Sequence, residues 1–214
     1  MDPDRPADNA PVLATTARGG AAAQGGLLLV LAGPSGVGKT SIAHALLRRF
    51  SGVFSVSATT RAAGPGEQEG VDYTFVDRQT FQRWIAQDRF LETALVYGRD
   101  YYGTLREPVD RALADGKLVI LDIDVQGAAE VRRRMPVMLG VFILPPSDEE
   151  LLRRLRSRAR ESEEQIERRF AQAHQETARA RQGGIFDALI VNTTLEAAIA
   201  EVAELITARM GKSA

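Results

Sequence analysis

The chain has 214 residues, 44% of them hydrophobic, and its 27 basic and 28 acidic side chains leave a formal charge of −1. This length predicts one domain with modest insertions and enough apolar material for a core. The charge balance argues against a nucleic acid or a membrane as partner, and no apolar run is long enough to span a bilayer. The absence of cysteine excludes disulfides and thiolate metal sites, which suits the reducing cytoplasm where we expect this protein.

Residues 1–25 are rich in Ala, Gly, Pro, Asp and Thr without hydrophobic periodicity, so we predict a disordered N-terminal tail. The first predicted element is the apolar run 27–32, which is typical of a buried parallel strand. A helical pattern follows, with Ile42, Leu46 and Phe50 spaced four residues apart. The octapeptide GPSGVGKT lies between this strand and this helix.

This octapeptide fits the phosphate-binding loop of nucleoside triphosphate-binding proteins without a mismatch. Its glycines let successive backbone N–H groups point at one anion, and the helix N-terminus adds partial positive charge at the same place. Lys39 is expected to reach the outer phosphates and to act in catalysis, and the Thr40 hydroxyl to bind Mg²⁺. The residues predicted to bind the triphosphate are Gly33, Pro34, Ser35, Gly36, Val37, Gly38, Lys39 and Thr40.

The next stretch of the chain, to residue 103, breaks the regular alternation of strands and helices and is richer in aromatic side chains. We predict that the stretch 54–61 begins as a strand and ends in hydroxyls and a cation. Strands are predicted at 73–76 and 90–96, a short helix at 79–87, a turn at 98–103 and a helix at 104–115. Because this stretch interrupts the alternating pattern, we interpret residues 59–103 as an inserted lobe.

The second half of the chain returns to alternation. Strands are predicted at 118–124, 138–144 and 188–191, and helices at 126–135, after Ser147, from Ser162 to about Arg181, and at 195–210 after the cap Thr194. Ser147 and Ser162 are each followed three residues later by Glu or Gln, which indicates two capping boxes. The pattern as a whole predicts an α/β fold, with a parallel sheet of the P-loop NTPase type flanked by helices.

Asp122 and Asp124 end a buried apolar strand, which is the second signature of phosphate-loop enzymes. In an open parallel sheet, ligands bind in the crevice at the carboxyl ends of the strands. We therefore predict that Asp122 joins Thr40 in holding Mg²⁺. Either aspartate taken alone could instead only cap the helix that follows.

A cluster of arginines lies around residue 160. Its members are Arg153, Arg154, Arg156, Arg158, Arg160, Arg168 and Arg169. A nucleic-acid patch is disfavoured, because glutamates interleave with the arginines and leave no clean basic face. Two interpretations remain, a solvated helix with weak ion pairs and a lid whose guanidiniums close over transferring phosphates. In the second interpretation, two or three of these arginines function and the rest lie at the surface.

Together these motifs resemble the bacterial guanylate kinases from about Leu27 to about Thr207. The segments that carry the resemblance are GPSGVGKT at 33–40, VSATTR at 56–61, GE-x-x-GVDY at 66–73, FLE at 90–92, YYGT at 101–104, ILDIDVQG at 120–127, FILPPS at 142–147 and the arginine-rich run 153–164. The resemblance implies transfer of the γ-phosphoryl group of ATP to GMP with Mg²⁺, giving ADP and GDP. The implied architecture is a core of residues 26–58, 104–150 and 170–214, a mixed α/β GMP-binding lobe at 59–103 and a helical lid at 151–169.

The resemblance also implies which residues bind GMP. Glu92 would accept hydrogen bonds from N1 and N2 of guanine and Ser57 would bind O6, a pattern that adenine does not match. Arg61, Tyr73 and Tyr102 would bind the phosphate, although each tyrosine taken singly is also an ordinary packing residue. The full implied set is Ser57, Arg61, Tyr73, Glu92, Tyr102, Thr104 and Asp124.

On the donor side, Arg158 and Arg169 match the catalytic lid arginines of the family near the ATP phosphates, and Asn192 matches a position near adenine. No general base is required, because the nucleophile is a phosphate oxygen whose second pKa is about 6 and which is largely deprotonated at neutral pH. Catalysis then rests on alignment and on charge neutralisation by Lys39, Mg²⁺ and the lid arginines.

Some positions depart from the family pattern. Gly64 stands where a second arginine is common, and Thr193 where aspartate is frequent. The loop 97–102 is one residue longer than usual, and we hypothesise that Arg99 replaces the missing cation. The rival functions are a phosphate-loop kinase for another acceptor such as AMP, which Glu92 argues against, and a protein-interaction module of the same fold, which the intact phosphate loop argues against. ATP and GMP are the expected partners, and the oligomeric state is left open, a homo-oligomer included.

Overall fold

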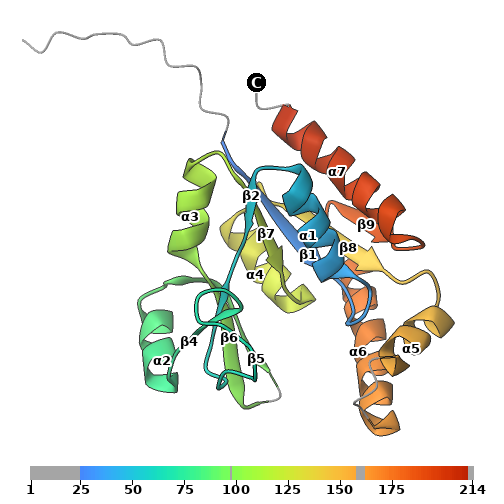
Figure 1. Ribbon diagram of the computed structural model, residues 1–214, viewed down its shortest axis with the longest axis horizontal. Helices are drawn as coiled ribbons and strands as arrows, with labels where there is room; N and C mark the ends of the chain where they lie inside the picture. The colour runs from blue at the N-terminus through green and yellow to red at the C-terminus, as the bar shows by residue number, and fades with distance from the viewer. Residues whose placement is uncertain (1–24, 97, 158–161, 212–214) are drawn as a thin grey trace, which may run out of the picture.

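The computed structural model describes residues 25–96, 98–157 and 162–211 (Figure 1). Its strands form two sheets, a five-stranded sheet in the order β2-β7-β1-β8-β9 and a four-stranded sheet in the order β4-β3-β6-β5. The two sheets confirm the α/β fold with a parallel core sheet and an inserted lobe. No helix in the described part of the chain is long and apolar enough to cross a membrane.

All neighbouring strands of the five-stranded sheet run parallel. The strands are β1 (Leu27–Ala32), β2 (Gly52–Phe54), β7 (Leu118–Asp122), β8 (Leu139–Leu144) and β9 (Ala188–Val191). Every residue of the central strand β1 is buried. Alternate residues of β1 enter opposite cores, Leu29 and Leu31 on one face and Leu28 and Val30 on the other. A strand covered on both faces therefore needs the uninterrupted apolar run seen in the sequence.

Helices cover both faces of this sheet (Figure 1). The first core packs against α1 (Lys39–Arg49), α5 (Asp148–Arg156), α6 (Glu163–Arg181) and α7 (Leu195–Gly211). The second core packs against α3 (Arg106–Ala114) and α4 (Val125–Arg134). A sheet with two apolar faces is expected to be covered by helices on both sides.

The four-stranded sheet is smaller and carries one helix. It contains β3 (Ser57–Thr59), β4 (Tyr73–Phe75), β5 (Phe90–Val96) and β6 (Asp100–Leu105), and α2 (Arg78–Ala86) packs on it. Its small core stacks Phe81 on Phe90 and on Tyr101, with ring centroids 4.5 and 5.4 Å apart. Figure 1 shows this sheet and the α5–α6 pair at the same end of the molecule, on either side of the loop between β1 and α1.

The structure corrects two expectations in the lobe. The predicted turn 98–103 is mostly strand β6, and the helix predicted from Thr104 begins at Arg106. Pairing with β5 and β3 on both sides holds residues 100–105 extended, which local turn propensity does not reveal. The stretch 54–61, predicted to begin as a strand, holds the end of β2 and all of β3, because the chain leaves the core sheet after Phe54 and enters the second sheet at Ser57.

The predicted helix starts are largely confirmed. Ser162 and Gln165 form a complete capping box at α6. Ser147 caps α5 through the backbone N–H of Glu150, but the reciprocal half of the second capping box is missing. The Glu150 carboxylate instead accepts hydrogen bonds from Arg153 and Arg154, whose charges outcompete a backbone amide.

Candidate active site

The phosphate loop joins β1 to α1 and is shaped by close backbone contacts. At Gly33, φ is +144° and a Cβ atom would lie 2.4 Å from the carbonyl oxygen of Ile143 in β8. No side chain fits there, so the loop can leave the sheet only through glycine. The helix begins at Lys39 directly after the loop, so its free N–H groups face the loop.

Lys39 and Thr40 meet the end of β7 at the mouth of this loop. Lys39 Nζ donates to the carbonyl oxygen of Gly33 at 2.8 Å and lies 3.7 Å from Asp122 Oδ1. Thr40 Oγ1 donates to Asp122 Oδ2 at 3.1 Å. The structure therefore brings together the three side chains predicted to hold Mg²⁺ and the outer phosphates, although 82 residues separate Thr40 from Asp122.

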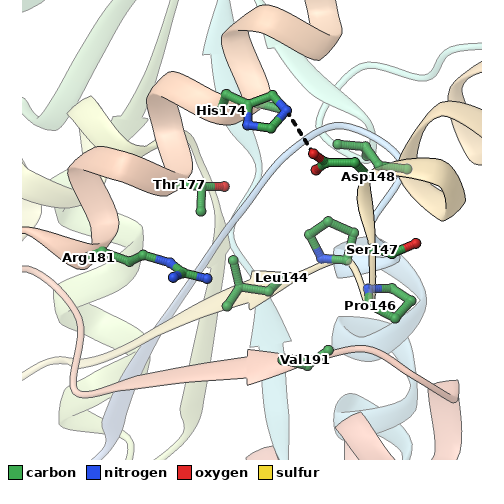
Figure 2. Close-up of a pocket in the computed structure, with 11 residues that line it drawn as sticks. Leu144, Pro146, Ser147, Asp148, His174, Thr177, Arg181 and Val191 are labelled. Atoms are coloured by element: carbon green, nitrogen blue, oxygen red, sulfur yellow. Dashed lines mark ion pairs between the residues drawn. The ribbon is translucent and has the colours of Figure 1, made fainter.

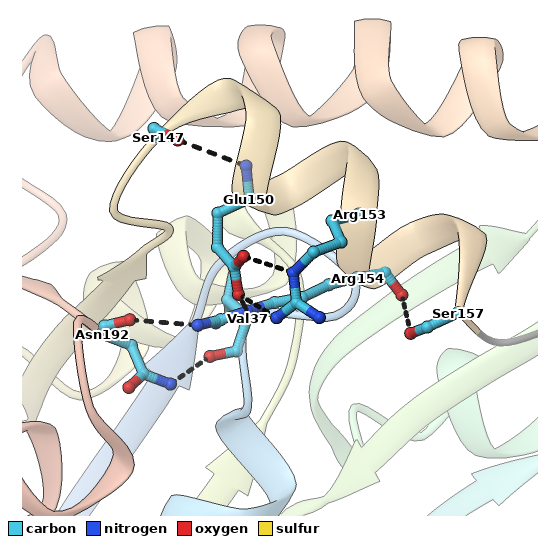
Figure 3. A network of polar contacts seen from close by, with 7 residues as sticks. All are labelled: Val37, Ser147, Glu150, Arg153, Arg154, Ser157 and Asn192. Atoms are coloured by element: carbon cyan, nitrogen blue, oxygen red, sulfur yellow. Dashed lines mark hydrogen bonds and ion pairs between the residues drawn. The ribbon is translucent and has the colours of Figure 1, made fainter.

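Asn192 supports the loop from the other side (Figure 3). Its Nδ2 atom donates to the carbonyl oxygen of Val37 at 2.7 Å, and the side chain is buried. Its Oδ1 atom has no hydrogen-bond partner within the described part of the protein, which leaves one acceptor for a ligand. Asn192, predicted near adenine, thus contacts the loop directly.

Figure 3 also shows an arginine for which the sequence predicted no individual role. Arg154 donates to Glu150 Oε1 at 2.6 Å and approaches the carbonyl oxygen of Asn192 at 3.4 Å. It thereby links α5 to the phosphate loop through Asn192. In the sequence, Arg154 stood out only as one member of the arginine cluster, and most members of that cluster were expected at the surface.

Three other arginines of the cluster lie at the surface. Arg153, Arg156 and Arg168 form exposed ion pairs with glutamates of α5 and α6. Arg169 differs, because its NH1 atom donates to Ser35 Oγ of the phosphate loop at 3.3 Å. Arg158, the second predicted catalytic arginine, lies outside the described residues.

A pocket of about 330 Å³ lies between the phosphate loop and α6. Lys39, Asp122, Asp124 and Arg169 line it together with Glu176, which the sequence did not single out. Burial raises the pKa of Glu176, and its carboxyl group accepts a hydrogen bond from Gln172 at 2.8 Å. Nothing in the helical pattern around Glu176 distinguished it from a surface acid.

Glu92 is a buried acid on β5, and its side chain is only 5% exposed. Thr104 Oγ1 donates to its Oε1 atom at 2.7 Å. Burial raises the pKa of Glu92 to about 7, and the charge of Asp124 adds to this effect while the Thr104 hydrogen bond opposes it. A Cβ atom at Gly127 would lie 3.0 Å from Glu92 Oε2, so a glycine in α4 makes room for this carboxyl group.

Asp124 caps the helix that follows it, one of the two roles that the sequence left open. Its Oδ1 atom caps α4 by accepting the N–H of Gly127 at 2.7 Å. It also lines the pocket that holds Lys39, and it lies close enough to Glu92 to affect its pKa. Asp124 therefore lies near both Lys39 of the phosphate loop and Glu92, the buried acid of the second sheet.

Four predicted residues form one row across the second sheet. Tyr73 pairs with Ser57, Ser57 with Thr104, and Thr104 with Glu92. Directly paired residues on neighbouring strands point to the same face of a sheet. The row therefore presents a phenol, two hydroxyls and a carboxyl group together, although these residues are spread over positions 57–104 of the chain.

Arg61 and Tyr102 lie beside this row. Arg61 Nε donates to the Tyr102 hydroxyl at 3.0 Å, and its guanidinium lies 5.3 Å from the centre of the Tyr73 ring. Burial raises the pKa of the Tyr73 hydroxyl, and the charge of Tyr102 adds to this effect. The three residues predicted to bind a phosphate are thus in mutual contact.

Two other features lie outside this site. Arg99 is at the tip of the β5–β6 hairpin, 79% exposed and paired with Asp100, so the structure gives no support to the hypothesis that it replaces the missing cation. A second pocket, of about 260 Å³, lies between α5, α6 and the end of β9 (Figure 2). Its lining includes the His174–Asp148 ion pair and none of the predicted site residues.

The parallel sheet with its phosphate loop, and the separate cluster of Arg61, Tyr73 and Tyr102, are features that a kinase of phosphorylated nucleosides would need. Together they are typical of the phosphate-loop nucleoside monophosphate kinases.

Comparison with known proteins narrows this class. The model of the guanylate kinase family matches residues 26–209. A guanylate kinase of Anaeromyxobacter dehalogenans is 49% identical over 183 residues, covering 85% of this chain and 80% of that protein. A guanylate kinase of Thermus thermophilus is 45% identical over 188 residues, covering 88% and 84%. The crystal structure of guanylate kinase from Anaplasma phagocytophilum has a TM-score of 0.69 at 34% identity, covering 87% of each chain. The chain belongs to the guanylate kinase family.

Proposed function

We propose that this protein transfers the γ-phosphoryl group of ATP to GMP, producing ADP and GDP. The observation that carries the proposal is the row Tyr73–Ser57–Thr104–Glu92, which ends in a buried carboxyl group. Guanine offers two adjacent N–H donors to a carboxylate and one carbonyl acceptor to a hydroxyl. Adenine would leave the buried acid without donors, and an unpaired buried acid is costly.

The four-stranded sheet with α2 is proposed as the GMP-binding lobe, and α5 with the start of α6 as the lid. Their boundaries follow the strands, so the lobe extends from Ser57 to Leu105 instead of from 59 to 103. Arg61, Tyr73 and Tyr102 would hold the GMP phosphate, whose own oxygen is the nucleophile. The proposal needs no catalytic base, because this oxygen is largely deprotonated at neutral pH.

On the donor side, the loop amides and Lys39 would hold the ATP phosphates. Arg169, which contacts Ser35 in the loop, would neutralise charge on the transferring group. Asn192, with its free Oδ1 acceptor, would receive the exocyclic amine of adenine. Arg158 is proposed as a second lid arginine on the resemblance alone.

Mg²⁺ is the proposed metal. Thr40 and Asp122 offer hydroxyl and carboxylate oxygens 3.1 Å apart, the hard ligands that Mg²⁺ prefers. Mg²⁺ binds to few protein atoms and takes its other ligands from phosphates and water, which suits a two-residue site. When bound with ATP it neutralises charge on the phosphate oxygens. The cytoplasmic location stays a prediction.

The test is a comparison of phosphoryl acceptors. With ATP and Mg²⁺, the expected kcat/KM for GMP exceeds that for AMP by at least about 10³-fold, because the polar groups of the site are satisfied only by guanine. Equal use of AMP would point to another acceptor. Failure to form ADP with either acceptor would favour an interaction module of the same fold.

A further inference from the structure

Glu67 contacts the proposed phosphate cradle, which consists of Arg61, Tyr73 and Tyr102. No prediction assigned Glu67 a role. Its Oε1 atom accepts from Arg61 NH2 at 2.7 Å, and its Oε2 atom accepts from the N–H of Gly64 at 2.6 Å. One carboxylate thus ties the guanidinium to the backbone of the loop that follows β3. Arg61 and Glu67 are each 27% exposed, so the pair lies at the open side of the cradle.

Hydrogen bonds and aromatic rings fix the position of the Arg61 guanidinium. Its Nε, NH1 and NH2 atoms donate to the Tyr102 hydroxyl, the carbonyl oxygen of Ala62 and Glu67. The rings of Tyr73 and Phe75 lie 5.3 and 5.9 Å from the guanidinium carbon. An arginine fixed in this way binds an anion without first losing the freedom of a long side chain.

The hydrogen-bond inventory of Arg61 leaves room for a phosphate. A guanidinium carries five N–H groups, and these three hydrogen bonds use one on each nitrogen. The terminal nitrogens therefore keep N–H donors beyond these hydrogen bonds, and such donors can bind a phosphate. Glu67 therefore need not leave when the phosphate arrives.

We propose that Glu67 is a positioning residue that presets Arg61 for the acceptor phosphate and remains bound to it in the complex. This inference rests on the proposed phosphate-binding role of Arg61. The position of Gly64 adds to it, because with no second cation there the cradle depends on the orientation of one guanidinium. The competing idea is that Glu67 is an internal anion that occupies the phosphate position and must be displaced.

The two ideas predict opposite signs for Glu67→Ala. If Glu67 presets Arg61, the Kd for GMP rises by about tenfold, since a rotamer-rich side chain must then be ordered on binding. The Kd for guanosine, which has no phosphate, stays within about twofold of wild type. Glu67→Gln keeps one acceptor for Arg61 and should raise the Kd for GMP by a smaller factor. In turnover, KM for GMP rises while kcat and KM for ATP change little.

Glu107→Ala is the matched control, because Glu107 also pairs with an arginine at 2.7 Å but lies on α3, in contact with none of the cradle residues. It should leave both Kd values unchanged. Tighter GMP binding by Glu67→Ala would establish the internal anion, and an unchanged value or a parallel loss of guanosine would also overturn the proposal. Arg61→Ala distinguishes failure of the Glu67 proposal from failure of the proposed phosphate site. If it leaves GMP favoured over guanosine as in wild type, the phosphate site itself is misplaced; if it removes that preference and Glu67→Ala does not, only the role of Glu67 fails.

Discussion

The two ends of the proposed site are built in different ways. The phosphate loop is eight consecutive residues, and it offers a ligand mainly backbone N–H groups and one lysine. The second sheet collects side chains from four strands, and their order in the row is not their order in the chain. Backbone recognition suits a polyphosphate shared by many proteins, whereas a row of side chains with a buried acid can distinguish one base from another.

The burial of charge differs in the same way. Lys39 and Asp122 lie 3.7 Å apart and are each less than one-fifth exposed, so opposite charges offset one another at the loop. Burial raises the pKa of Glu92 to about 7, hydrogen bonds from Thr104 oppose this shift, and the charges of two nearby acids, Asp124 and Glu130, add to it. The acid at the phosphate loop is therefore paired with a cation, whereas the acid on the second sheet lies near other acids.

The largest expected effect comes from removing the cation of the donor end. Lys39→Ala should lower kcat by about 10³-fold, because a charge that faces the transferring phosphoryl group is lost. The affinity for GMP should stay at its wild-type value, since Lys39 lies outside the row. Stopped-flow or steady-state turnover and calorimetry with GMP measure the two quantities, and a parallel loss of GMP affinity would show that the two ends are not independent.

At the acceptor end, Glu92→Gln should lower kcat/KM for GMP by about 10²-fold, because a charge-assisted pair of hydrogen bonds is lost from a buried site. The KM for ATP should change little. Steady-state kinetics with each substrate varied in turn gives both numbers. A loss that falls equally on ATP and GMP would remove the distinction between the ends.

The same carboxyl group should make the free protein less stable as the pH rises. Its pKa is near 4.5 in the unfolded chain and about 7 in the folded protein, so the folded state binds more protons between these values. Stability therefore falls between about pH 5 and pH 8, by on the order of 3 kcal/mol from this group. Urea unfolding without nucleotide measures this decline. Glu92→Gln should flatten it, and an equal slope in both proteins would show that the acid is ionised throughout.

The smallest effect is expected at the tip of the hairpin. Arg99→Ala should leave KM for GMP within about twofold of wild type, because this guanidinium is exposed and already paired with Asp100. A KM several times higher would restore the hypothesis that Arg99 supplies the second cation. Initial rates with varied GMP settle the point.

The sequence predicts the phosphate-loop end of the site better than the second sheet. The loop, its strand and Asp122 are local patterns with a physical mechanism, and the structure joins them as expected. The row in the second sheet was reached only through a family resemblance, because pairing between distant strands leaves no local periodicity. For the same reason residues 98–103 were interpreted as a turn although most of them are strand β6.

The missed residues have a related explanation. Glu67 lies in a loop rich in glycine, where an acid looks like ordinary solvated surface until Arg61 is placed beside it. Gly127 lies inside the helix α4, where a glycine leaves space for the carboxyl group of Glu92 on β5. Both roles are defined by tertiary contacts, so only the folded chain reveals them.

The central claim is that Glu92 becomes ionised to bind the guanine base. Calorimetric titration with GMP at pH 7, in buffers of different ionisation enthalpy, measures the protons released on binding. Wild type should release about half a proton more than Glu92→Gln, because a carboxyl group with a pKa of about 7 is half protonated at this pH before the base arrives. Equal proton release by the two proteins, with GMP bound by both, would contradict the account.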